Sequence, residues 1–317
     1  MAEVMKVYAN FHTHTTHSDG VYTPRELAEM AAKEGYRALA ITDHDTCTGN
    51  RFGAEACREL GLDFMSGIEF STQTRSPRQW FHMTAFHFDP EYPEMKEYLR
   101  KMGERETHQT EVCFRRGLEI GYLHDVTWEE VLEFNKDNNW ICNEHVFRLL
   151  KAKGLATDLE YPEFFATCYG KHRAEVPPLY PFMDAEKLIP LVHAAGGIIC
   201  AAHPSVHLHM IEYLAGIGLD GIEVWHSLLS AEKRREALRL AREYDLFVSG
   251  GSDHEGLCGG QYLRYADPTQ CEFYFPELTL GTTAYFAEEL LACKKKADRR
   301  EVMDALLADD TLWERTK

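Results

Sequence analysis

The sequence predicts an α/β fold in which short strands and helices alternate to form a parallel sheet or barrel. From Val4 to about Gly67, apolar runs of strand length alternate with helical segments, and the alternation resumes at Asp184. Several of the expected strands also end in His, Asp or Glu. Because the carboxyl ends of strands in such sheets and barrels meet on one face, this pattern indicates an active site there.

The first expected strand, Val7–His14, places its apolar residues along one face. Thr23 is a good N-cap for the helix that follows, since Pro24 stands at the first helical position and Glu26 completes a Thr-x-x-Glu capping box. Gly35 ends this helix. The elements expected next are a strand at Arg37–Thr42, a helix at about Gly53–Leu60, and strands at Leu62–Met65 and Trp80–Phe88.

Residues 90–183 interrupt the alternation and are rich in Glu, Lys, Arg and aromatic residues. Helical periodicity covers Met95–Gly117 and Trp128–Asn135, and Thr127 forms a second capping box with Glu130. We therefore expect a mostly helical insertion that caps the substrate. The predicted organisation is residues 1–89 as the first part of the barrel, 90–183 as the insertion, and 184–317 as the second part with a C-terminal tail.

The α/β alternation continues from Asp184 toward the end of the chain. His203 follows an expected strand at Ile198–Ala202, and Asp253 follows another at Leu246–Gly250. The other expected elements are helices at Ala185–Ala195, about His209–Gly216, Ala231–Tyr244 and near Arg299–Leu307, and strands at Gly221–Trp225 and Glu272–Phe275.

The amino-acid composition indicates which kinds of partner and which cellular compartment to expect. An apolar content of 44% over 317 residues is enough for a buried core. The net charge of −17, without any basic block, argues against a long nucleic-acid partner, because phosphate backbones are bound by clustered Lys and Arg.

Nine cysteines, an odd number without a C-x-x-C pair, indicate reduced thiols in a cytoplasmic protein. We find no signal core or membrane-spanning run, so we expect no membrane partner, and nothing indicates an oligomeric state.

Two short segments carry the chemistry. Phe11–Gly20 (FHTHTTHSDG) and Ala38–Thr46 (ALAITDHDT) gather imidazoles and carboxylates at the ends of apolar runs. His12 and His14 point the same way in an extended chain, and Asp19 follows in a turn that can fold back toward them. Such groups would repel one another and lose hydration unless a cation lay between them. We therefore predict a divalent metal site and metal-assisted hydrolysis, rather than a surface turn that happens to carry histidines.

Six motifs, taken in order, resemble those of the PHP family, the polymerase-and-histidinol-phosphatase metal-dependent phosphoesterases. The resemblance implies a distorted (βα)7-type barrel that binds two or three divalent ions. Imidazole and carboxylate ligands favour Mn, Zn or Fe as these ions. It also implies hydrolysis of a phosphate monoester or cyclic diester of a small phosphorylated metabolite or nucleotide through a metal-bound hydroxide. The motifs are His12-Thr-His14 with Ser18-Asp19-Gly20, Thr42-Asp43-His44-Asp45, Gly67-Ile68-Glu69, Phe81-His82, Ala202-His203-Pro204 and Gly251-Ser252-Asp253.

The resemblance also assigns ligand roles to individual residues. Glu69 would bridge two of the ions. The ligands implied are His12, His14, Glu69 and Asp253 for the first ion, His82 and His203 for the second, and Asp19 with His44 for the third.

The last motif departs from the family pattern. The family usually shows Asp-x-His, whereas this chain reads Asp253-His254-Glu255. Because residues i and i+2 of an extended chain point the same way, we expect Glu255 to be the metal ligand beside Asp253. His254 is then expected to contact the substrate or to donate a proton, and Asp253 is counted among the catalytic residues.

The insertion is expected to supply the groups that hold the substrate. His145 stands where the family often has Arg-x-His, with Asn143 in place of the Arg. We expect His145 to bind the substrate or to protonate the leaving oxygen. The other candidates for substrate binding are Arg115, Arg116, Arg148 and Lys171; for the arginines, an ordinary solvated helix face is the alternative.

Three other functions fit the same motifs. A 5′-end exonuclease or nucleoside bisphosphate phosphatase acting on short RNA is the first, although the acidic charge weighs against it. A phosphatase of the histidinol phosphate type is less favoured because of the insertion. A non-catalytic PHP module is the third, and the nearly complete ligand set argues against it.

Overall fold

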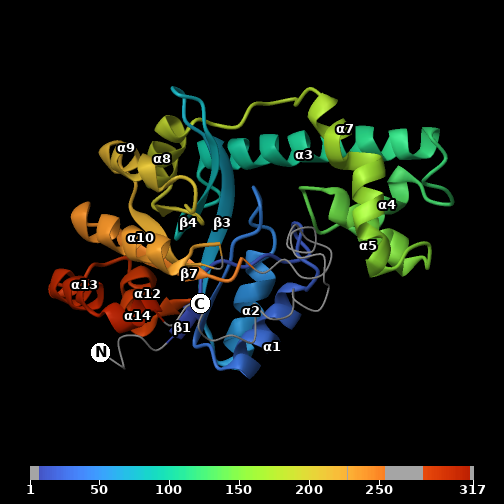
Figure 1. Ribbon diagram of the computed structural model, residues 1–317. Coiled ribbons are helices and arrows are strands. Elements are labelled where there is room, and N and C mark those ends of the chain that lie inside the picture. The colour runs from blue at the N-terminus through green and yellow to red at the C-terminus, as the bar shows by residue number, and fades with distance from the viewer. Residues whose placement is uncertain (1–6, 227, 254–280, 315–317) are drawn as a thin grey trace.

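The computed structural model describes residues 7–226, 228–253 and 281–314. At its centre is an eight-stranded mixed sheet (Figure 1). The strands follow one another across the sheet in the order β7-β6-β5-β4-β3-β2-β1-β8. Their bounds are β1 (Val7–Asn10), β2 (Ala38–Ile41), β3 (Asp63–Gln73), β4 (Trp80–Phe86), β5 (Ile198–Ala201), β6 (Gly221–His226), β7 (Phe247–Gly251) and β8 (Thr282–Thr283).

The sheet curls until β7 meets β1. The backbone N–H of Phe11 donates to the carbonyl of Gly250 at 3.2 Å, and the N–H of Asp253 donates to the carbonyl of His12 at 2.9 Å. A side chain at Gly251 would collide with the backbone of His12, so the approach of the two segments requires glycine there. The sheet is therefore a nearly closed barrel, as the sequence predicts.

The direction of β4 corrects the expectation of a uniformly parallel sheet. The strands β1, β2 and β3 are parallel, as are β5, β6 and β7, but β4 lies antiparallel between β3 and β5. Gln73 at the end of β3 pairs directly with Trp80 at the start of β4. Because no crossover helix separates the two strands, the chain can return only in the antiparallel direction.

Helices pack against the barrel strands and cover them. The first helix begins as predicted: the Thr23 hydroxyl accepts from the N–H of Glu26, whose carboxylate accepts from the N–H of Thr23. Gly35, with φ 85°, ends it in the left-handed conformation. These helices are α1 (Pro24–Glu34), α2 (Asn50–Leu60), α8 (Ala185–Ala194), α9 (Ile211–Gly216), α10 (Ala231–Glu243), α12 (Ala284–Leu291), α13 (Arg299–Ala308) and α14 (Asp310–Glu314).

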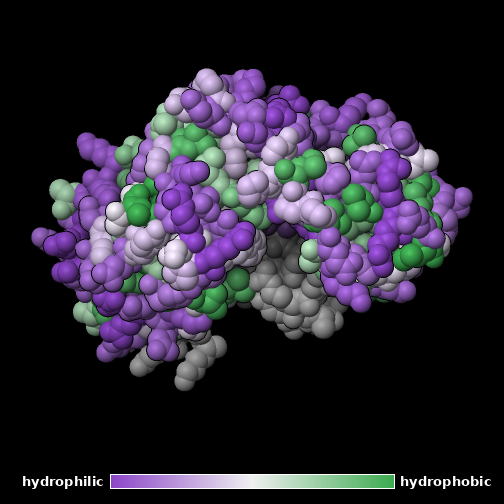
Figure 2. All heavy atoms as spheres, turned by 90° about the horizontal axis from the view of Figure 1, so that it is seen from above, coloured by the Kyte–Doolittle hydropathy of each residue, from purple (hydrophilic) through white to green (hydrophobic). Residues whose placement is uncertain are grey.

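The predicted helical insertion forms a second lobe beside the barrel (Figures 1 and 2). It has its own apolar core, which includes Phe114, Phe147 and Phe164. The first half of its longest helix instead packs into the barrel core through Met95 and Tyr98, so this helix belongs to both lobes. The helices are α3 (Pro93–Glu119), α4 (Trp128–Phe134), α5 (Asn143–Ala152), α6 (Tyr161–Phe164) and α7 (Gly170–Glu175), with a π-helical turn at Phe165–Tyr169 and 3₁₀ turns at Asp158–Glu160 and, in the barrel, Leu208–Met210.

The expectations of no membrane-spanning helix and of reduced cysteines can be compared with the described part of the chain. None of its helices is both long enough and apolar enough to cross a bilayer. The seven cysteines found there are free thiols. The strand expected at Glu272–Phe275 lies outside the described residues.

Candidate metal centre

The strand ends bring the sequence motifs to one edge of the barrel. His12 and His14 follow β1, His44 follows β2, and Glu69 lies within β3. His82 lies near the start of β4, and because β4 runs antiparallel, its first residues lie at the edge where the parallel strands end. The same edge receives His203 after β5 and Asp253 after β7.

Glu69 lies at the centre of this cluster and is fully buried. Its Oε2 is 3.2 Å from Nε2 of His12, from Nε2 of His14 and from Nδ1 of His44. Its Oε1 is 3.0 Å from Nδ1 of His82 and 2.8 Å from Nε2 of His203. One carboxylate thus faces imidazoles from four strands or their ends.

Two aspartates lie on either side of Glu69. Asp253 places Oδ1 3.1 Å from Nε2 of His14 and 3.5 Å from Nε2 of His12. Asp19 places its two oxygens 3.4 Å from Nδ1 of His14 and 3.5 Å from Nε2 of His44. Asp253 and His203 have φ of 54° and 29°, a conformation that non-glycine residues rarely adopt and that is found preferentially at functional sites.

The orientation of these atoms tests whether the cluster fits a cation. Nε2 of His12, Nε2 of His14, Nδ1 of His44 and Oε2 of Glu69 are buried without a hydrogen-bond partner, although they lie close together. Buried polar atoms are normally paired, so atoms that converge without hydrogen bonding one another are what a ligand set requires. The groups whose donor atoms lie within 4.8 Å of one another include His12 with His14, Glu69 and Asp253; His14 with Asp19 and His44; and His44 with Glu69 and His82.

Without a metal ion, the imidazoles and carboxylates of the cluster shift one another's pKa values. Burial alone would raise the pKa of Glu69, but the imidazoles of His12, His82 and His44 hold it well below its usual range. Burial would lower the pKa of His12, but the carboxylates of Glu223, Glu69 and Asp253 raise it well above its usual range. A cation at the centre would take the place of these imidazole protons, so metal binding should release protons.

Glu223 of β6 holds His12 in one tautomer. Nδ1 of His12 donates to Oε1 of Glu223 at 2.8 Å, so in the neutral ring, after loss of the other proton, the lone pair that faces Glu69 lies on Nε2. The other oxygen of Glu223 accepts from the backbone N–H of His203 at 2.5 Å. Carboxylates that orient metal-binding histidines in this way are common. Glu223 is recognisable in the sequence only as an acid near the end of an expected strand.

His226 also lies at this edge, but its hydrogen bonding argues against a ligand role. Its Nδ1 accepts from the backbone N–H of Leu228 at 3.1 Å, so the neutral ring carries its proton on Nε2. That nitrogen faces Oδ2 of Asp253 at 3.4 Å. His226 therefore turns an N–H toward Asp253, although this nitrogen makes no hydrogen bond within the described residues.

A cavity of about 520 Å³ lies between the cluster and the insertion. Its barrel side includes Asp19, His44 and His82 of the cluster. Its aromatic walls are Trp80, Trp140 and Phe182; Trp140 is buried, whereas 53% of Trp80 is exposed. The insertion contributes Arg105, Glu106 and Gln109 of α3, Asn143 and Glu144 of α5, Tyr161 of α6 and Arg173 of α7. Apart from Asn143, which the sequence places in a family motif, these insertion residues were not expected from the sequence, because each resembles an ordinary polar position on an amphipathic helix.

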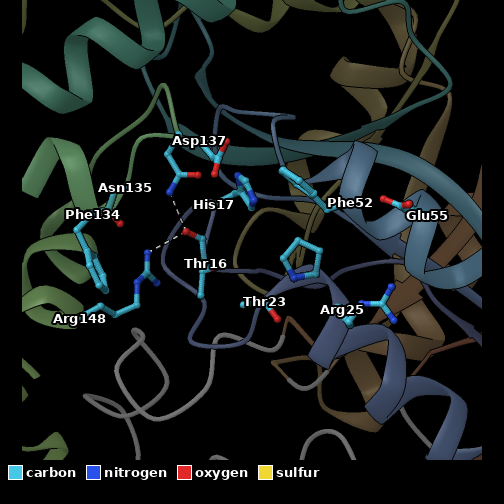
Figure 3. Close-up of a pocket in the computed structure, with 12 residues that line it drawn as sticks. Thr16, His17, Thr23, Arg25, Phe52, Glu55, Phe134, Asn135, Asp137 and Arg148 are labelled. Carbon is cyan, nitrogen blue, oxygen red and sulfur yellow. Dashed lines mark hydrogen bonds between the residues drawn. The ribbon is translucent and has the colours of Figure 1, made fainter. Parts of the chain in front are cut away.

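Arg148, expected to bind the substrate, contacts backbone instead. Its guanidinium donates to the carbonyls of Thr16, at 3.0 Å, Ser18, at 3.1 Å, and Gly20. It lines a different cavity of about 440 Å³, between the α1–α2 side of the barrel and the α4–α5 side of the insertion. Figure 3 shows Arg148 reaching across this cavity to Thr16. The arginine thus anchors the loop that carries Asp19.

His145, also expected at the substrate, is fully buried at the start of α5. Its Nδ1 accepts from the N–H of Cys142 at 3.1 Å, and its Nε2 lies 2.7 Å from Nδ2 of Asn138. Burial and the charge of Arg148 lower the pKa of His145 well below its usual range. It is not among the residues that line the 520 Å³ cavity, and these contacts give it a structural role at the helix end.

The remaining candidates lie elsewhere. Arg115 and Arg116 line a cavity of about 540 Å³ on the outer side of α3, and Arg115 pairs with Glu111. Lys171 is exposed on α7 and does not line the cavity beside the cluster. His254 and Glu255 lie outside the described residues, so both roles stay predictions.

Comparisons with known proteins agree with this arrangement. Residues 10–139 match the family described as PHP domain. The chain is 28% identical over 261 residues to a 5′-3′ exoribonuclease of Haemophilus influenzae, covering 79% of this chain and 90% of the relative. It is 27% identical over 252 residues to a phosphoribosyl 1,2-cyclic phosphate 1,2-diphosphodiesterase of Eggerthella lenta, covering 79% and 95%.

A solved structure extends the likeness to the fold. The crystal structure of a proposed metal-dependent phosphoesterase from Bifidobacterium adolescentis superimposes with a TM-score of 0.69 at 27% identity. The match covers 92% of this chain and 98% of the other, so it includes both the barrel and the insertion. With the motifs assembled at one edge of a barrel of this type, residues 10–139 carry a PHP domain, and the chain as a whole is similar to metal-dependent phosphoesterases that contain it.

Proposed function

We propose that the protein hydrolyses a phosphate ester of a small nucleotide or phosphorylated metabolite at the Glu69 cluster. The observation that carries this proposal is the cluster around the buried carboxylate of Glu69, which faces five imidazoles. Two of these imidazoles, His44 and His82, line a cavity of about 520 Å³. That volume suits a mononucleotide-sized molecule rather than a folded nucleic acid. The phosphate would lie against the cluster, and the rest of the molecule would extend toward the insertion.

The residues around Glu69 are suited to hold two or three divalent ions. We assign His12, His14 and Asp253 to one ion and His82 with His203 to another, with Glu69 between them. Asp19 and His44 are assigned to a third position. Mixed imidazole and carboxylate ligands favour Mn, Zn or Fe over Mg and Ca. Such ions, when bound, stabilise negative charge on phosphoryl oxygens and lower the pKa of water.

The protein's own groups would set the geometry of the reaction. Glu223 holds Nδ1 of His12 through a hydrogen bond, and His226 lies beside Asp253. Trp140 closes one side of the cavity and reduces access of bulk water, which strengthens electrostatic interactions with the phosphate. The proton donor to the leaving oxygen is still assigned to His254 as a prediction.

Cleavage of a phosphodiester is the second arm of the proposal. Both curated relatives described above have names that refer to phosphodiester substrates, in one case RNA and in the other a cyclic phosphate. The net charge of −17 restricts this arm to cyclic phosphates or very short oligonucleotides.

The test is a release assay on metal-stripped protein resupplied with Mn²⁺. The panel would contain mononucleotides, sugar phosphates, cyclic phosphates and 5′-phosphorylated dinucleotides. We expect hydrolysis of at least one member, lost by more than about a thousand-fold in Glu69→Gln. Glu59→Gln, which changes an exposed carboxylate on α2, is the matched control and should behave as wild type. Hydrolysis of no member, or full activity in Glu69→Gln, would refute the proposal.

A further inference from the structure

The insertion side of the active-site cavity carries a cation that forms no ion pair within the described part of the chain, although Glu106 and Asp45 line the same cavity. Arg105 projects from α3 into the cavity. Among the described residues, no carboxylate oxygen lies within 4.0 Å of its guanidinium nitrogens. Its only hydrogen bond there runs from Nη1 to Oε1 of Gln109 at 3.1 Å, and its Nε is buried without a partner. A partly buried guanidinium in this state has donors left over for a ligand.

The position of Arg105 is fixed although its charge is not neutralised. The carbon of its guanidinium lies 3.9 Å from the centre of the Phe182 ring, within the range of a cation–π contact. Gln109, which holds Nη1, is itself anchored by a hydrogen bond from its amide to the carbonyl of Val176 at 3.1 Å. The guanidinium is therefore held in place before any ligand arrives, which reduces the entropy lost on binding.

Other charged side chains that line the cavity, from the insertion and from the barrel, have hydrogen-bond partners. Arg173 donates to Glu106, which neutralises both charges. Glu144 accepts from the hydroxyl of Tyr161, and Asp45 accepts from the backbone N–H of Ser71 at 3.0 Å. Of the two arginines that line the cavity, Arg105 is thus the one without a carboxylate partner in the described structure.

The start of α5 does not offer an alternative anion site. The family resemblance places an Arg where this chain has Asn143. Here the amide of Asn143 donates to Glu144 at 2.7 Å and to the hydroxyl oxygen of Tyr161 at 2.9 Å. This corner therefore holds an amide whose donors are already bonded and a carboxyl group, whereas the arginine without an ion pair in the described structure lies on α3.

We propose that Arg105 anchors a second anion subsite, so that the preferred substrate carries a phosphate or carboxylate in addition to the phosphate that is hydrolysed. This inference rests on the proposed function. A planar guanidinium with free donors matches an oxyanion in a two-pronged hydrogen-bonded contact. The cluster would hold the reacting phosphate, and Arg105 would select molecules whose second anion reaches across the cavity.

Two substrate pairs test the proposal and separate its two anion types. Adenosine 3′,5′-bisphosphate and adenosine 5′-monophosphate differ by a phosphate, and 3-phosphoglycerate and glycerol 3-phosphate differ by a carboxylate. For wild type we expect kcat/KM to be at least about ten-fold higher for the member with the second anion in at least one pair. The pair that shows the difference identifies the anion.

The variants are Arg105→Met, Arg105→Lys and, as a matched control, Arg100→Met. Arg100 lies on the same helix and pairs with Glu97 and Glu104 outside the cavity. In Arg105→Met, the preference for the second anion should fall about ten-fold or more, mainly through KM, and Arg105→Lys should recover part of it because it keeps the charge. Arg100→Met should keep the wild-type preference. Melting temperatures would establish that each variant is folded.

Equilibrium binding separates failure of this inference from failure of the proposed function. Metal-free wild type would be titrated with adenosine 3′,5′-bisphosphate by calorimetry, alongside Arg105→Met and Arg100→Met. Binding weakened about ten-fold only in Arg105→Met, together with no hydrolysis of any compound, would retain the subsite and refute the proposed function. Hydrolysis with equal preference and equal binding in all three proteins would overturn the subsite and leave the proposed function standing.

Discussion

Glu223 accepts a hydrogen bond from Nδ1 of His12 at 2.8 Å and, through its other oxygen, one from the backbone N–H of His203 at 2.5 Å. A single buried carboxylate on β6 therefore links residues that follow β1 and β5. Because the bond to Glu223 keeps a proton on Nδ1, the proton that His12 gives up to a metal ion is the one on Nε2, whose lone pair then points at the Glu69 cluster. Glu223 thus prepares His12 for metal binding without being a ligand itself.

Replacing Glu223 should weaken metal binding more than it affects the stability of the fold. Removal of a carboxylate that orients a ligating histidine typically costs 10- to 100-fold in metal affinity, and we expect Glu223→Ala to fall in that range. Glu223→Gln should lose less, since its amide oxygen can still accept from His12. Competition titrations with a chromophoric chelator would measure Zn²⁺ affinity, with the exposed Glu232→Gln on α10 as control. Equal affinity in Glu223→Ala and wild type would show that this hydrogen bond does not position the ligand.

Removing the metal should lower thermal stability. The metal-free cluster keeps imidazole and carboxylate atoms buried without hydrogen-bond partners, which is a state that a cation relieves. Ligand binding to the folded state adds RT ln(1 + [L]/Kd), or about 2.7 kcal/mol at a hundred times Kd. We expect the Tm of stripped protein to rise continuously with added Mn²⁺, and the rise to be much smaller in Glu69→Gln. A Tm independent of Mn²⁺ in wild type would contradict this.

Glu144 should make the metal-free protein less stable as the pH rises from 4.5 to about 7. Burial and the neighbouring Asp19 raise the pKa of Glu144 to about 7, from 4.5. Since the folded state binds this proton more tightly, its contribution is present in full below pH 4.5 and is lost as the pH rises to about 7. Glu144→Gln keeps an acceptor for Tyr161 but has no charge to bury. Relative to wild type, it should gain about 2 to 3 kcal/mol between pH 4.5 and pH 8.

Urea unfolding of metal-free protein at several pH values would measure this difference. The control is Glu133→Gln, an exposed carboxylate on α4 whose surface ion pair with Lys136 contributes little. A stability difference between Glu144→Gln and wild type that does not change with pH would show that Glu144 has the same pKa in the folded and the unfolded state.

Arg148 should contribute to stability rather than to substrate binding. Its guanidinium donates to the carbonyls of Thr16, Ser18 and Gly20, and Arg148→Met would leave these acceptors without their partner. We expect a loss of about 1 to 3 kcal/mol in the free energy of unfolding. Metal affinity should also fall, because the anchored loop carries Asp19. Arg58→Met, at an exposed position on α2, is the control. Raised KM with unchanged stability in Arg148→Met would instead support a substrate contact.

Local sequence patterns predicted the parts of the fold that depend on neighbouring residues. The capping boxes at Thr23 and Thr127 are present because each involves groups three residues apart. The gathering of His12, His14 and Glu69 was predictable because residues at strand ends share an edge whatever the length of the connections. The direction of β4 was not predicted, since it depends on a connection too short for a crossover helix.

Side-chain directions in the insertion could not be derived from the sequence. Arg148 and His145 fit a family motif, but each is used by the fold: Arg148 holds a loop and His145 closes a helix end. Arg105 belongs to no motif and faces the active site only because α3 crosses the cavity. Which charged residue of a long helix faces a cavity depends on the packing of the lobe, not on the helix alone.

The most direct test of the account is the metal content of the purified chain after dialysis against Mn²⁺ or Zn²⁺, measured by elemental analysis. The account predicts at least two tightly held ions per wild-type chain and a clear loss in Glu69→Gln, since Glu69 lies between the two principal ligand groups. A wild-type chain that retains no ion, or a Glu69→Gln chain that retains as many as wild type, would contradict it.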